Sequence, residues 1–398
     1  MTTFEATDFY DLDALLTPDE REVRDDVRRW VDERFLPIVA EHYQAGTFPM
    51  ELVPELAQLG VFGPAIKGHG CPGLGNVAAG LIMQELERGD SGLRTFASVQ
   101  GSLAMMAIDL FGSEEQKTRW LPEMARGTKL GCFALTEPDF GSNPGGLRTR
   151  ARKAGDGYRL SGAKKWIGNA TIADVSVVWA KIEGEPGVDP ESAGAIRGFL
   201  VEKGTPGFKA CLIEGKLSLR AALTAEIEFD DCALPADALL PQSRGLRSPL
   251  TCLNHARYGI SWGVIGAAMA CFDEARQYAM RREQFGRPIG SFQLVQAKLA
   301  RMLTEITKAQ LLALRLAQLK DAGTAKHYHI SMAKMNNVEI ALDAARVARD
   351  ILGGVGILDQ HQCFRHMCNL ESVKTYEGTH DIHLLVLGQE ITGIPAFG

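Results

Sequence analysis

The sequence predicts an α+β multidomain protein: an all-α N-terminal domain, a middle antiparallel β-barrel or sandwich domain, and a C-terminal four-helix bundle. Helical periodicity fills the first third of the chain, and short β-rich runs fill the middle third. Long amphipathic segments return in the last third. We place the three domains at residues 1–130, 131–242 and 243–398. A chain of 398 residues is long enough for two or three domains.

The N-terminal domain begins with a helix-capping signal. Residues 17–20 (Thr-Pro-Asp-Glu) form a capping box with Pro at the first helical position. Val27 and Trp30 follow at helical spacing, and residues 113–116 open a second helix in the same way. The glycine-rich stretch 68–75 lacks the lysine and spacing of a P-loop, so we do not expect a phosphate site there.

The middle domain contains short strand-like runs at 175–179, 198–201 and 225–229. In the last run, apolar residues alternate with Glu226 and Glu228, the pattern of a half-buried antiparallel strand. Helices do not alternate with these strands, which disfavours a parallel Rossmann sheet. Residues 234–241 are expected to form the exit linker.

The C-terminal domain is expected to be a bundle. Apolar residues between 295 and 306 follow one face of a helix that ends near Gly323. A further helix over 340–352 stops at Gly353-Gly354, because glycine commonly ends a helix.

Composition excludes several classes of protein. Hydrophobic content of 45% and charged content of 23% are ordinary for a globular chain. A net charge of -6 argues against nucleic-acid binding, and no apolar run is long enough to span a membrane. The acidic N-terminus resembles neither a signal nor a transit peptide, and the eight cysteines show no CxxC pair. We therefore expect a cytoplasmic protein.

The most informative segment for function is 376–383 (Tyr-Glu-Gly-Thr-His-Asp-Ile-His). Glu377 stands between an aromatic residue and a glycine, without a basic neighbour in sequence. Desolvation would raise the pKa of such a carboxylate and make it a stronger base towards a weakly acidic C–H bond. The alternative is an ordinary glutamate at a helix N-terminus, stabilised by the macrodipole. The segment alone leaves both interpretations open.

Eight short motifs extend along the chain in a specific order and spacing. They are residues 87–94 (ERGDSGLR), 133–138 (FALTEP), 141–142 (GS), 165–167 (KWI), 253–259 (LNHARYG), 282–286 (REQFG), 352–356 (LGGVG) and 376–383 (YEGTHDIH). In these motifs the chain resembles the acyl-CoA dehydrogenases from end to end. It is most similar to the glutaryl-CoA dehydrogenase branch.

The resemblance implies an FAD enzyme that forms a homotetramer, a dimer of dimers, with the flavin at the junction of the three domains. The implied reaction is α,β-dehydrogenation of an acyl-CoA thioester. A base removes the α proton, hydride passes from the β carbon to flavin N5, and an electron-transferring flavoprotein then accepts the electrons. In the glutaryl branch the distal carboxylate then leaves as carbon dioxide, which gives crotonyl-CoA.

The same resemblance assigns substrate residues. Glu377 matches the catalytic base, and Gly378 allows close approach of the ligand to the backbone. Arg94 matches an arginine that pairs with the distal carboxylate of the substrate, assisted by Glu87. The remaining matches to substrate-binding positions are Ser142 on the pantetheine arm, Arg257, and Tyr376, which is typical of the branch. A solvated Arg94 at a helix end, paired with Glu87 or Asp90, is the alternative.

Cofactor residues follow from the resemblance as well. Those expected at the isoalloxazine are Phe133, Leu135, Thr136, Trp166 and Ile167, and Thr379 is also placed with the cofactor. Those expected at the pyrophosphate and adenosine of a neighbouring subunit's FAD are Arg282, Gln284 and Phe285, with Gly353 and Gly354 in a turn near the same moiety. Without the resemblance, core packing of Phe133 and Trp166 and a helix C-cap at Gly353 would be the favoured interpretations.

Four positions depart from the family pattern. Gly168 replaces a threonine whose hydroxyl bonds flavin N5, and Leu93 replaces an aromatic residue beside Arg94. Asn143 replaces an aspartate, and Val355 replaces an asparagine. These departures cluster where cofactor and substrate are expected to meet, so the chain is a divergent member by this comparison.

No metal site is expected. The soft-ligand cluster of His361, Cys363, His366 and Cys368 matches no standard zinc spacing, and Arg365 lies within it. Glu377, His380 and His383 lie three apart, but the His-Glu-x-x-His pattern is absent.

Two alternative functions remain open. One is a dehydrogenase or oxidase of another short acyl thioester, carried by CoA or by a carrier protein. The other is a non-catalytic protein with a flavin-enzyme fold.

Overall fold

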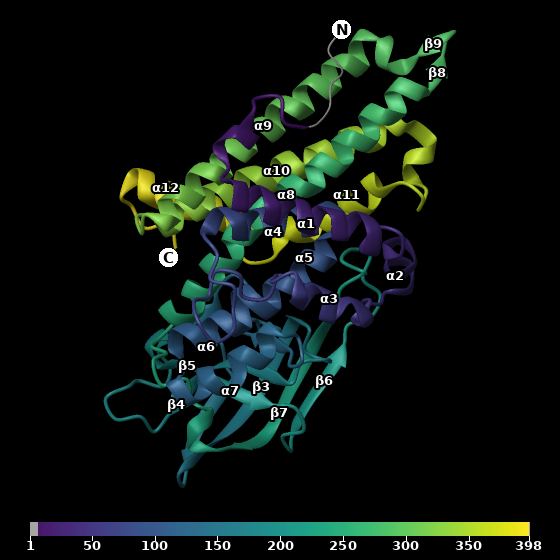
Figure 1. Ribbon diagram of the computed structural model, residues 1–398. Helices are drawn as coiled ribbons and strands as arrows, with labels where there is room; N and C mark the ends of the chain where they lie inside the picture. The colour runs from purple at the N-terminus through teal and green to yellow at the C-terminus, as the bar shows by residue number, and fades with distance from the viewer. Residues whose placement is uncertain (1–6, 398) are drawn as a thin grey trace.

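The computed structural model describes residues 7–397, and Figure 1 shows a helical body with a β sheet at one end. The N-terminal helices are α1 (Pro18–Trp30), α2 (Val39–Ala45), α3 (Val53–Gln58), α4 (Asn76–Gly89), α5 (Ser91–Ser98), α6 (Met106–Phe111) and α7 (Glu114–Ala125). Two π-helical segments, η2 (Val31–Phe35) and η4 (Val99–Met105), and two 3-10 turns, η1 (Leu12–Leu15) and η3 (Met50–Leu52), accompany them. The capping boxes predicted at Thr17 and Ser113 are both confirmed.

The middle of the chain folds into one seven-stranded sheet. Its strands are β1 (Gly131–Ala134), β2 (Arg150–Ala154), β3 (Gly157–Gly168), β4 (Val175–Glu183), β5 (Ile196–Glu202), β6 (Phe208–Leu212) and β7 (Thr224–Leu234). The 3-10 turns η5 (Pro144–Gly146), η6 (Ala193–Ala195) and η7 (Ala236–Ala238) connect or follow them.

The three predicted strand runs are confirmed as the cores of β4, β5 and β7. Strand β7 pairs antiparallel with both β3 and β6, and its side chains alternate between buried and exposed as expected. The sheet is mixed rather than antiparallel throughout, because β4 pairs parallel with β1 and with β2. In the sequence, the antiparallel strands β2 and β3 come between β1 and β4. The chain therefore returns to the starting edge and runs along β4 in the same direction as along β1.

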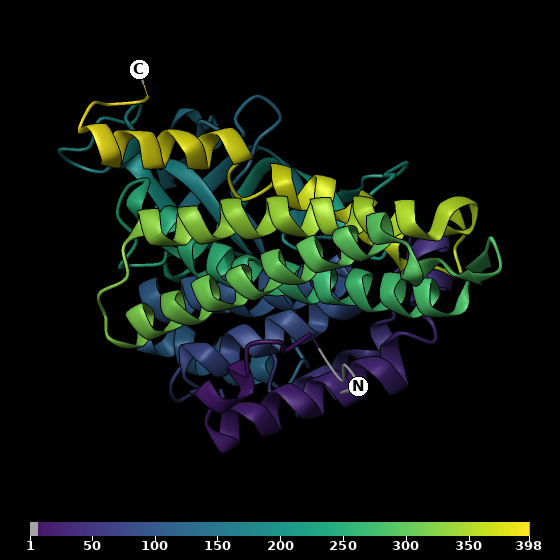
Figure 2. The same ribbon diagram turned by 90° about the horizontal axis from the view of Figure 1, so that it is seen from above.

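The C-terminal part is a bundle of long helices. Its elements are α8 (Arg247–Arg281), β8 (Glu283–Gln284), β9 (Arg287–Pro288), η8 (Ile289–Ser291), α9 (Gln293–Asp321), α10 (His327–Leu352), η9 (Gly353–Ile357), α11 (Gln362–Thr375) and α12 (His380–Thr392). Helix α9 ends near Gly323 and α10 ends at Gly353, as predicted, but α10 begins 13 residues earlier than the predicted start at Ile340. Viewed from above, the long C-terminal helices lie between the N-terminal helices and α12 (Figure 2).

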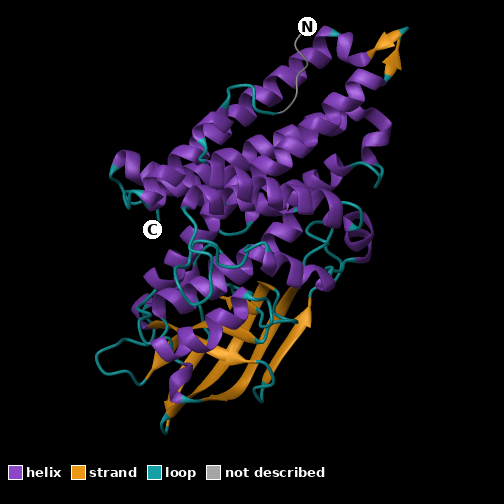
Figure 3. Ribbon diagram, in the orientation of Figure 1, coloured by secondary structure: helices purple, strands orange, loops and turns teal. Residues whose placement is uncertain are grey.

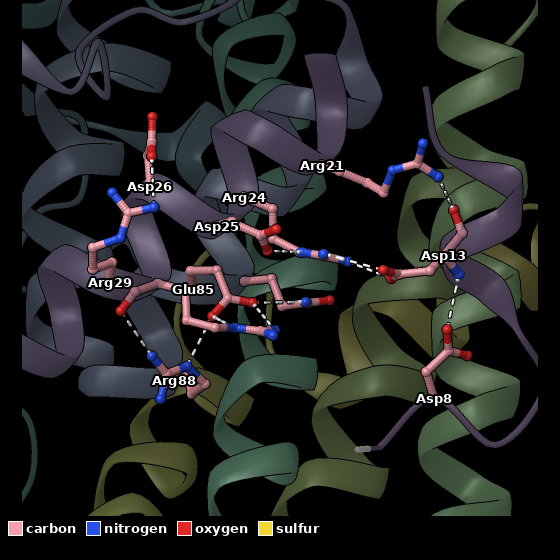
Figure 4. Close-up of polar contacts among 11 residues, drawn as sticks. Asp8, Asp13, Arg21, Arg24, Asp25, Asp26, Arg29, Glu85 and Arg88 are labelled. Atoms are coloured by element: carbon pink, nitrogen blue, oxygen red, sulfur yellow. Dashed lines mark hydrogen bonds and ion pairs between the residues drawn. The ribbon is translucent and has the colours of Figure 1, made fainter. Parts of the chain in front are cut away.

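Charged side chains attach the first helix to the rest of the protein. Arg24 of α1 pairs with Asp13 of the preceding segment, and Arg88 pairs with Glu85 on α4 (Figure 4). The Glu85 carboxylate is fully buried and accepts hydrogen bonds from Arg28 of α1 at 2.9 and 3.0 Å and from Arg88 at 2.8 Å. The two arginines hold the pKa of Glu85 below its usual value against the opposing effect of burial, which is the largest single influence.

Replacing Glu85 with Ala should therefore destabilise the protein. The substitution leaves the guanidinium groups of Arg28 and Arg88 without their buried acceptor, which we expect to lower the free energy of unfolding by about 3 kcal/mol. Urea unfolding measures this change. The matched control is Glu305→Ala on α9, where the ion pair with Lys308 is exposed and we expect a loss below about 0.5 kcal/mol. Equal losses in the two variants would contradict the prediction.

None of the helices between residues 7 and 397 is long and apolar enough to cross a membrane.

Candidate active site

The turn between α11 and α12 places Glu377. Helix α11 ends at Thr375, and α12 begins at His380 with Thr379 as its N-cap, whose hydroxyl accepts a 3.2 Å bond from the Ile382 N–H. Glu377 thus precedes the cap and does not belong to the first helical turn. It adopts a left-handed backbone conformation (φ 54°). The macrodipole interpretation of this glutamate is therefore wrong, since that effect is confined to the helix end.

Two cationic side chains, one half-buried (Arg257) and one buried (Lys334), hold the carbonyls of this turn. Arg257 of α8 donates its Nε–H to the carbonyl of Glu377 at 2.7 Å. Lys334 of α10 donates from Nζ to the carbonyls of Tyr376 at 3.1 Å and Gly378 at 2.8 Å. Three successive carbonyls thus each accept a bond from a cationic side chain. Gly378 has φ 94°, a conformation that favours glycine.

The Glu377 carboxylate lies in an environment suited to a base. Its Oε2 atom is buried and has no hydrogen-bond partner among the described residues. Burial raises the pKa of Glu377 above its usual value, while the positive charges of Arg94, Arg257 and Lys334 act in the opposite direction. A buried carboxylate with a free lone pair and a raised pKa can accept a proton from a carbon acid near neutral pH.

Arg94 lies against the same turn and is fully buried. Its Nε–H donates to Glu87 Oε2 at 2.7 Å, and its Nη2 donates to the Tyr376 hydroxyl, so α4, α5 and the α11–α12 turn meet at this side chain. The alternative interpretation of Arg94 as a solvated residue at a helix end is therefore wrong, although its predicted pairing with Glu87 is confirmed. Burial raises the pKa of Tyr376 to about 12, so the phenol remains neutral.

Close packing of α8 permits this ion pair. A Cβ atom on Gly263 would lie 2.2 Å from Glu87 Oε2 and 3.3 Å from Arg94 Cγ. Any side chain at position 263 would displace the pair, since such a contact is far inside van der Waals distance.

Several polar atoms around the pocket are buried without a hydrogen-bond partner in the described part of the chain. They are Glu87 Oε1, Arg94 Nη1, Thr95 Oγ1, Ser98 Oγ and Glu377 Oε2. Buried polar groups in native proteins are nearly always bonded. These unpartnered atoms are concentrated on α4, α5 and the 376–378 turn, which fits a site that receives a polar ligand.

Strand β3 presents a large aromatic side chain to solvent. Trp166 is 57% exposed and has φ 64°, at an irregularity of the β3–β7 pairing between Lys164 and Ile167. The neighbouring Ile167 is buried. Because Trp166 is exposed, the interpretation that it packs in the core is wrong. An exposed tryptophan held by a left-handed backbone suits stacking against a flat aromatic cofactor.

The end of β1 lies against this part of β3. Phe133 and Leu135 are buried, and the Phe133 ring packs 5.7 Å from the ring of Trp179. The backbone carbonyl of Thr136 accepts a 2.9 Å bond from Lys165. Phe133 and Leu135 can therefore offer a ligand only their backbone, whereas Thr136 is half-buried and accessible.

Packing accounts for one departure from the family pattern. A Cβ atom on Gly168 would lie 3.0 Å from Val99 Cγ2, at the start of the π-helical segment η4. The absence of a side chain lets β3 approach that segment closely.

The remaining predicted cofactor residues lie elsewhere in the chain. Arg282, Gln284 and Phe285 occupy the β8–β9 hairpin, which projects at the corner opposite the main sheet (Figure 3). Phe285 is 93% exposed. Gly353 and Gly354 are exposed in η9, the turn that follows α10. The structure therefore does not bring these residues together with Trp166 within one chain. Ser142 is exposed in the loop after β1.

The cysteine and histidine cluster has structural contacts. His361 Nδ1 lies 3.0 Å from Glu274, and Arg365 pairs with Asp90 at 2.9 Å, while Cys363 is buried. Over residues 7–397, no group of three His, Cys, Asp or Glu side chains is arranged to hold a metal ion.

Sequence reasoning missed Lys334 and Gly263. A signal for Lys334 was present, because it lies four residues after Ile330 and seven before Ala341 on the buried face of α10. A lysine in an apolar helical stripe is unusual and indicates a specific partner. Gly263 gave no signal, since a glycine inside a long helix has no unique interpretation.

Three family models match consecutive parts of the chain. The acyl-CoA dehydrogenase N-terminal, middle and C-terminal domains match residues 17–128, 132–232 and 243–392. The chain is also 33% identical over 383 residues to the short-chain specific acyl-CoA dehydrogenase of Clostridium acetobutylicum, which covers 96% of this chain and 100% of that protein.

Solved structures show the same fold. A glutaryl-CoA dehydrogenase from Mycobacterium smegmatis in complex with FADH2 has a TM-score of 0.96 and 48% identity, with both chains covered completely. A second structure of glutaryl-CoA dehydrogenase from that organism has a TM-score of 0.95 and 50% identity, covering 99% of this chain and 100% of that one.

The three-domain fold and these matches place the chain in a class of flavin-dependent dehydrogenases. The chain belongs to the acyl-CoA dehydrogenase family, whose members are FAD-dependent oxidoreductases.

Proposed function

We propose that this protein oxidises glutaryl-CoA or a related dicarboxylic acyl-CoA at the α,β position, with decarboxylation to crotonyl-CoA in the glutaryl case. The observation that carries this proposal is Arg94. Its guanidinium group is buried against the turn that carries Glu377 and keeps Nη1 without a partner among the described residues. A distal carboxylate would supply an anionic acceptor for that N–H group. The resemblance to two glutaryl-CoA dehydrogenase structures supports the same substrate.

Glu377 acts as the base in this proposal. Its free Oε2 atom takes the α proton of the thioester, and the bonds from Arg257 and Lys334 hold the turn while it does so. FAD, when bound, supplies the two-electron oxidant that accepts the hydride from the β carbon. The distal carboxylate then leaves as carbon dioxide, its bonding electrons pass into the conjugated thioester, and the Glu377 carboxylic acid returns the proton.

Chain residues in two regions would hold FAD. Trp166 and Ile167, with the backbone of Phe133, Leu135 and Thr136, would contact the ring system. The hairpin residues Arg282, Gln284 and Phe285, the turn at Gly353 and Gly354, and Thr379 complete the proposed set. The hairpin lies at the end of the molecule away from the main sheet (Figure 3), whose strand β3 carries Trp166. This arrangement supports a homotetramer in which the hairpin reaches a neighbouring subunit.

Substrate and electron acceptor complete the proposal. Ser142 would contact the pantetheine arm of CoA, at the exposed loop after β1. An electron-transferring flavoprotein would reoxidise the enzyme, which would work in the cytoplasm.

A short monocarboxylic acyl-CoA is the second candidate substrate. The charge of Arg94 is already balanced by Glu87 at 2.7 Å, so the pocket could accept an uncharged acyl tail. The resemblance to the short-chain enzyme of Clostridium acetobutylicum favours this candidate.

Anaerobic bleaching of the bound flavin distinguishes the two candidates. We expect glutaryl-CoA to bleach the yellow protein with kcat/KM at least about 100-fold above butyryl-CoA, because one charge-assisted pair is worth about 3 kcal/mol. Carbon dioxide is assayed in the same reactions. Preferred bleaching by butyryl-CoA would overturn the dicarboxylic proposal, and a protein that binds no flavin would overturn the enzyme assignment.

A further inference from the structure

We infer that Lys334 is a positioning residue that holds Glu377 in its reactive conformation and keeps its carboxylate ionised. The inference rests on the proposed function, since it assigns a task to Lys334 only if Glu377 is the base. Lys334 belongs to α10, a helix that the sequence motifs include only at its last residue, Leu352. Its side chain is 1% exposed, so the ammonium group was withdrawn from water to reach this turn.

The first part of the inference concerns backbone conformation. A non-glycine residue with a left-handed backbone costs roughly 1–2 kcal/mol and persists only where surrounding contacts enforce it. Lys334 Nζ bonds the carbonyls on both sides of Glu377, at Tyr376 (3.1 Å) and Gly378 (2.8 Å). One ammonium group therefore brackets the strained residue. Arg257 bonds the carbonyl between them at 2.7 Å, so the turn cannot relax without breaking a charge-assisted bond.

The second part concerns charge. The carboxylate of Glu377 faces Arg94 from α5, Arg257 from α8 and Lys334 from α10, with Glu87 from α4 as the opposing negative charge. Burial, with the neighbouring charges of Arg257 and Arg94, lowers the pKa of Lys334 to about 7, so its positive charge is fully present on the acid side of neutrality, where the acid limb is measured. His383 on α12 faces Lys334 in turn. Burial lowers the pKa of His383 to about 3, so this histidine is neutral at working pH. Among these cations, Lys334 alone also bonds the carbonyls of both residues that flank Glu377, Tyr376 and Gly378.

Loss of the lysine charge should make Glu377 harder to ionise. An opposite charge within a few ångströms lowers the pKa of a carboxyl group by about 1–3 units, so its removal raises that pKa. The base must be ionised to accept a proton, and the acid limb of the pH–rate profile therefore moves to higher pH. A purely structural lysine would change stability without moving that limb.

The test compares Lys334→Met and Lys334→Arg with wild type, using the flavin-loaded protein and the thioester that bleaches it best. For Lys334→Met we expect the acid limb of kcat/KM to move up by about one unit, kcat to fall at least tenfold and KM to change less than threefold. Lys334→Arg keeps a charged donor and should restore the wild-type limb. If Lys334→Met does not fold, Lys334→Gln, which keeps donors without the charge, takes its place.

Lys216→Met is the matched control. Lys216 is half-buried and donates to the carbonyls of Leu219 and Ala222 at 2.8 and 2.6 Å, but it lies in the β6–β7 connection. We expect it to lower the melting temperature as Lys334→Met does and to leave the acid limb in place. The inference is overturned if Lys334→Met keeps the wild-type acid limb, or if Lys216→Met moves that limb as far as Lys334→Met does. Wild-type activity in Glu377→Gln would instead overturn the proposed base, so the two failures are distinguishable.

Discussion

Replacing Glu377 with Gln should lower the rate of flavin bleaching by at least about 1,000-fold, because the amide cannot accept the α proton. The substitution keeps the size of the side chain and the left-handed turn around it. We therefore expect normal flavin content and thioester binding within about threefold of wild type. Stopped-flow absorbance under anaerobic conditions measures the rate, and the shift of the flavin spectrum on adding thioester measures binding.

The matched control is Glu371→Gln, six residues earlier in the chain. Its carboxylate is exposed on α11 and pairs with Arg346, and we expect full activity. In wild type, burial raises the pKa of Glu377, so activity should fall as the pH drops through that raised value. Undiminished bleaching by Glu377→Gln would remove the catalytic assignment, whatever the behaviour of the control.

Replacing Arg94 with Gln should lower kcat/KM for glutaryl-CoA by about 100- to 1,000-fold, since truncating one member of a buried charge pair costs about 3–4 kcal/mol. Butyryl-CoA carries no distal carboxylate, and its kcat/KM should change less than about tenfold. The informative quantity is the ratio of the two constants, because Arg94 also acts on the pKa of Glu377 and that effect is common to both thioesters.

The single variant leaves Glu87 buried and unpaired, which is destabilising. The double variant Arg94→Gln with Glu87→Gln removes both charges and should recover most of the melting temperature. It should not recover the preference for glutaryl-CoA. If both thioesters lose activity equally in each variant, Arg94 serves the structure of the pocket and the short-chain candidate is favoured.

Sequence patterns predicted helices and strands well where one face of the helix or strand is exposed to water. Strand β7 and the capped starts of α1 and α7 carry patterns that depend only on local residues. Helix α8 was not predicted over its 35 residues, because its middle is buried on every side and shows no apolar stripe. The parallel pairing of β4 with β1 and β2 was missed for a different reason, since strand direction depends on long-range connections.

The candidate site divides in a similar way. Glu377, Glu87 and Arg94 were identified from motifs, and the structure brings them together with Tyr376. The bonds from Lys334 and Arg257 to the turn depend on the crossing of α8 and α10 over α11, which no local pattern encodes. The close contact of Gly168 with Val99 likewise joins segments about 70 residues apart in the chain.

The crossing of α8 and α10 over α11 brings Arg257 and Lys334 to the turn, and it therefore also determines the net charge around Glu377. With Lys334 protonated, Arg94, Arg257 and Lys334 are three cations facing the two anions Glu87 and Glu377. One positive charge remains uncompensated in a space from which an acyl chain would expel water. A thioester with a carboxylate at its far end brings the missing negative charge, whereas a monocarboxylic one leaves the surplus in place. Decarboxylation would remove that distal carboxylate and leave the site with its surplus positive charge again. The product, whose acyl chain is uncharged, would then be favoured to depart.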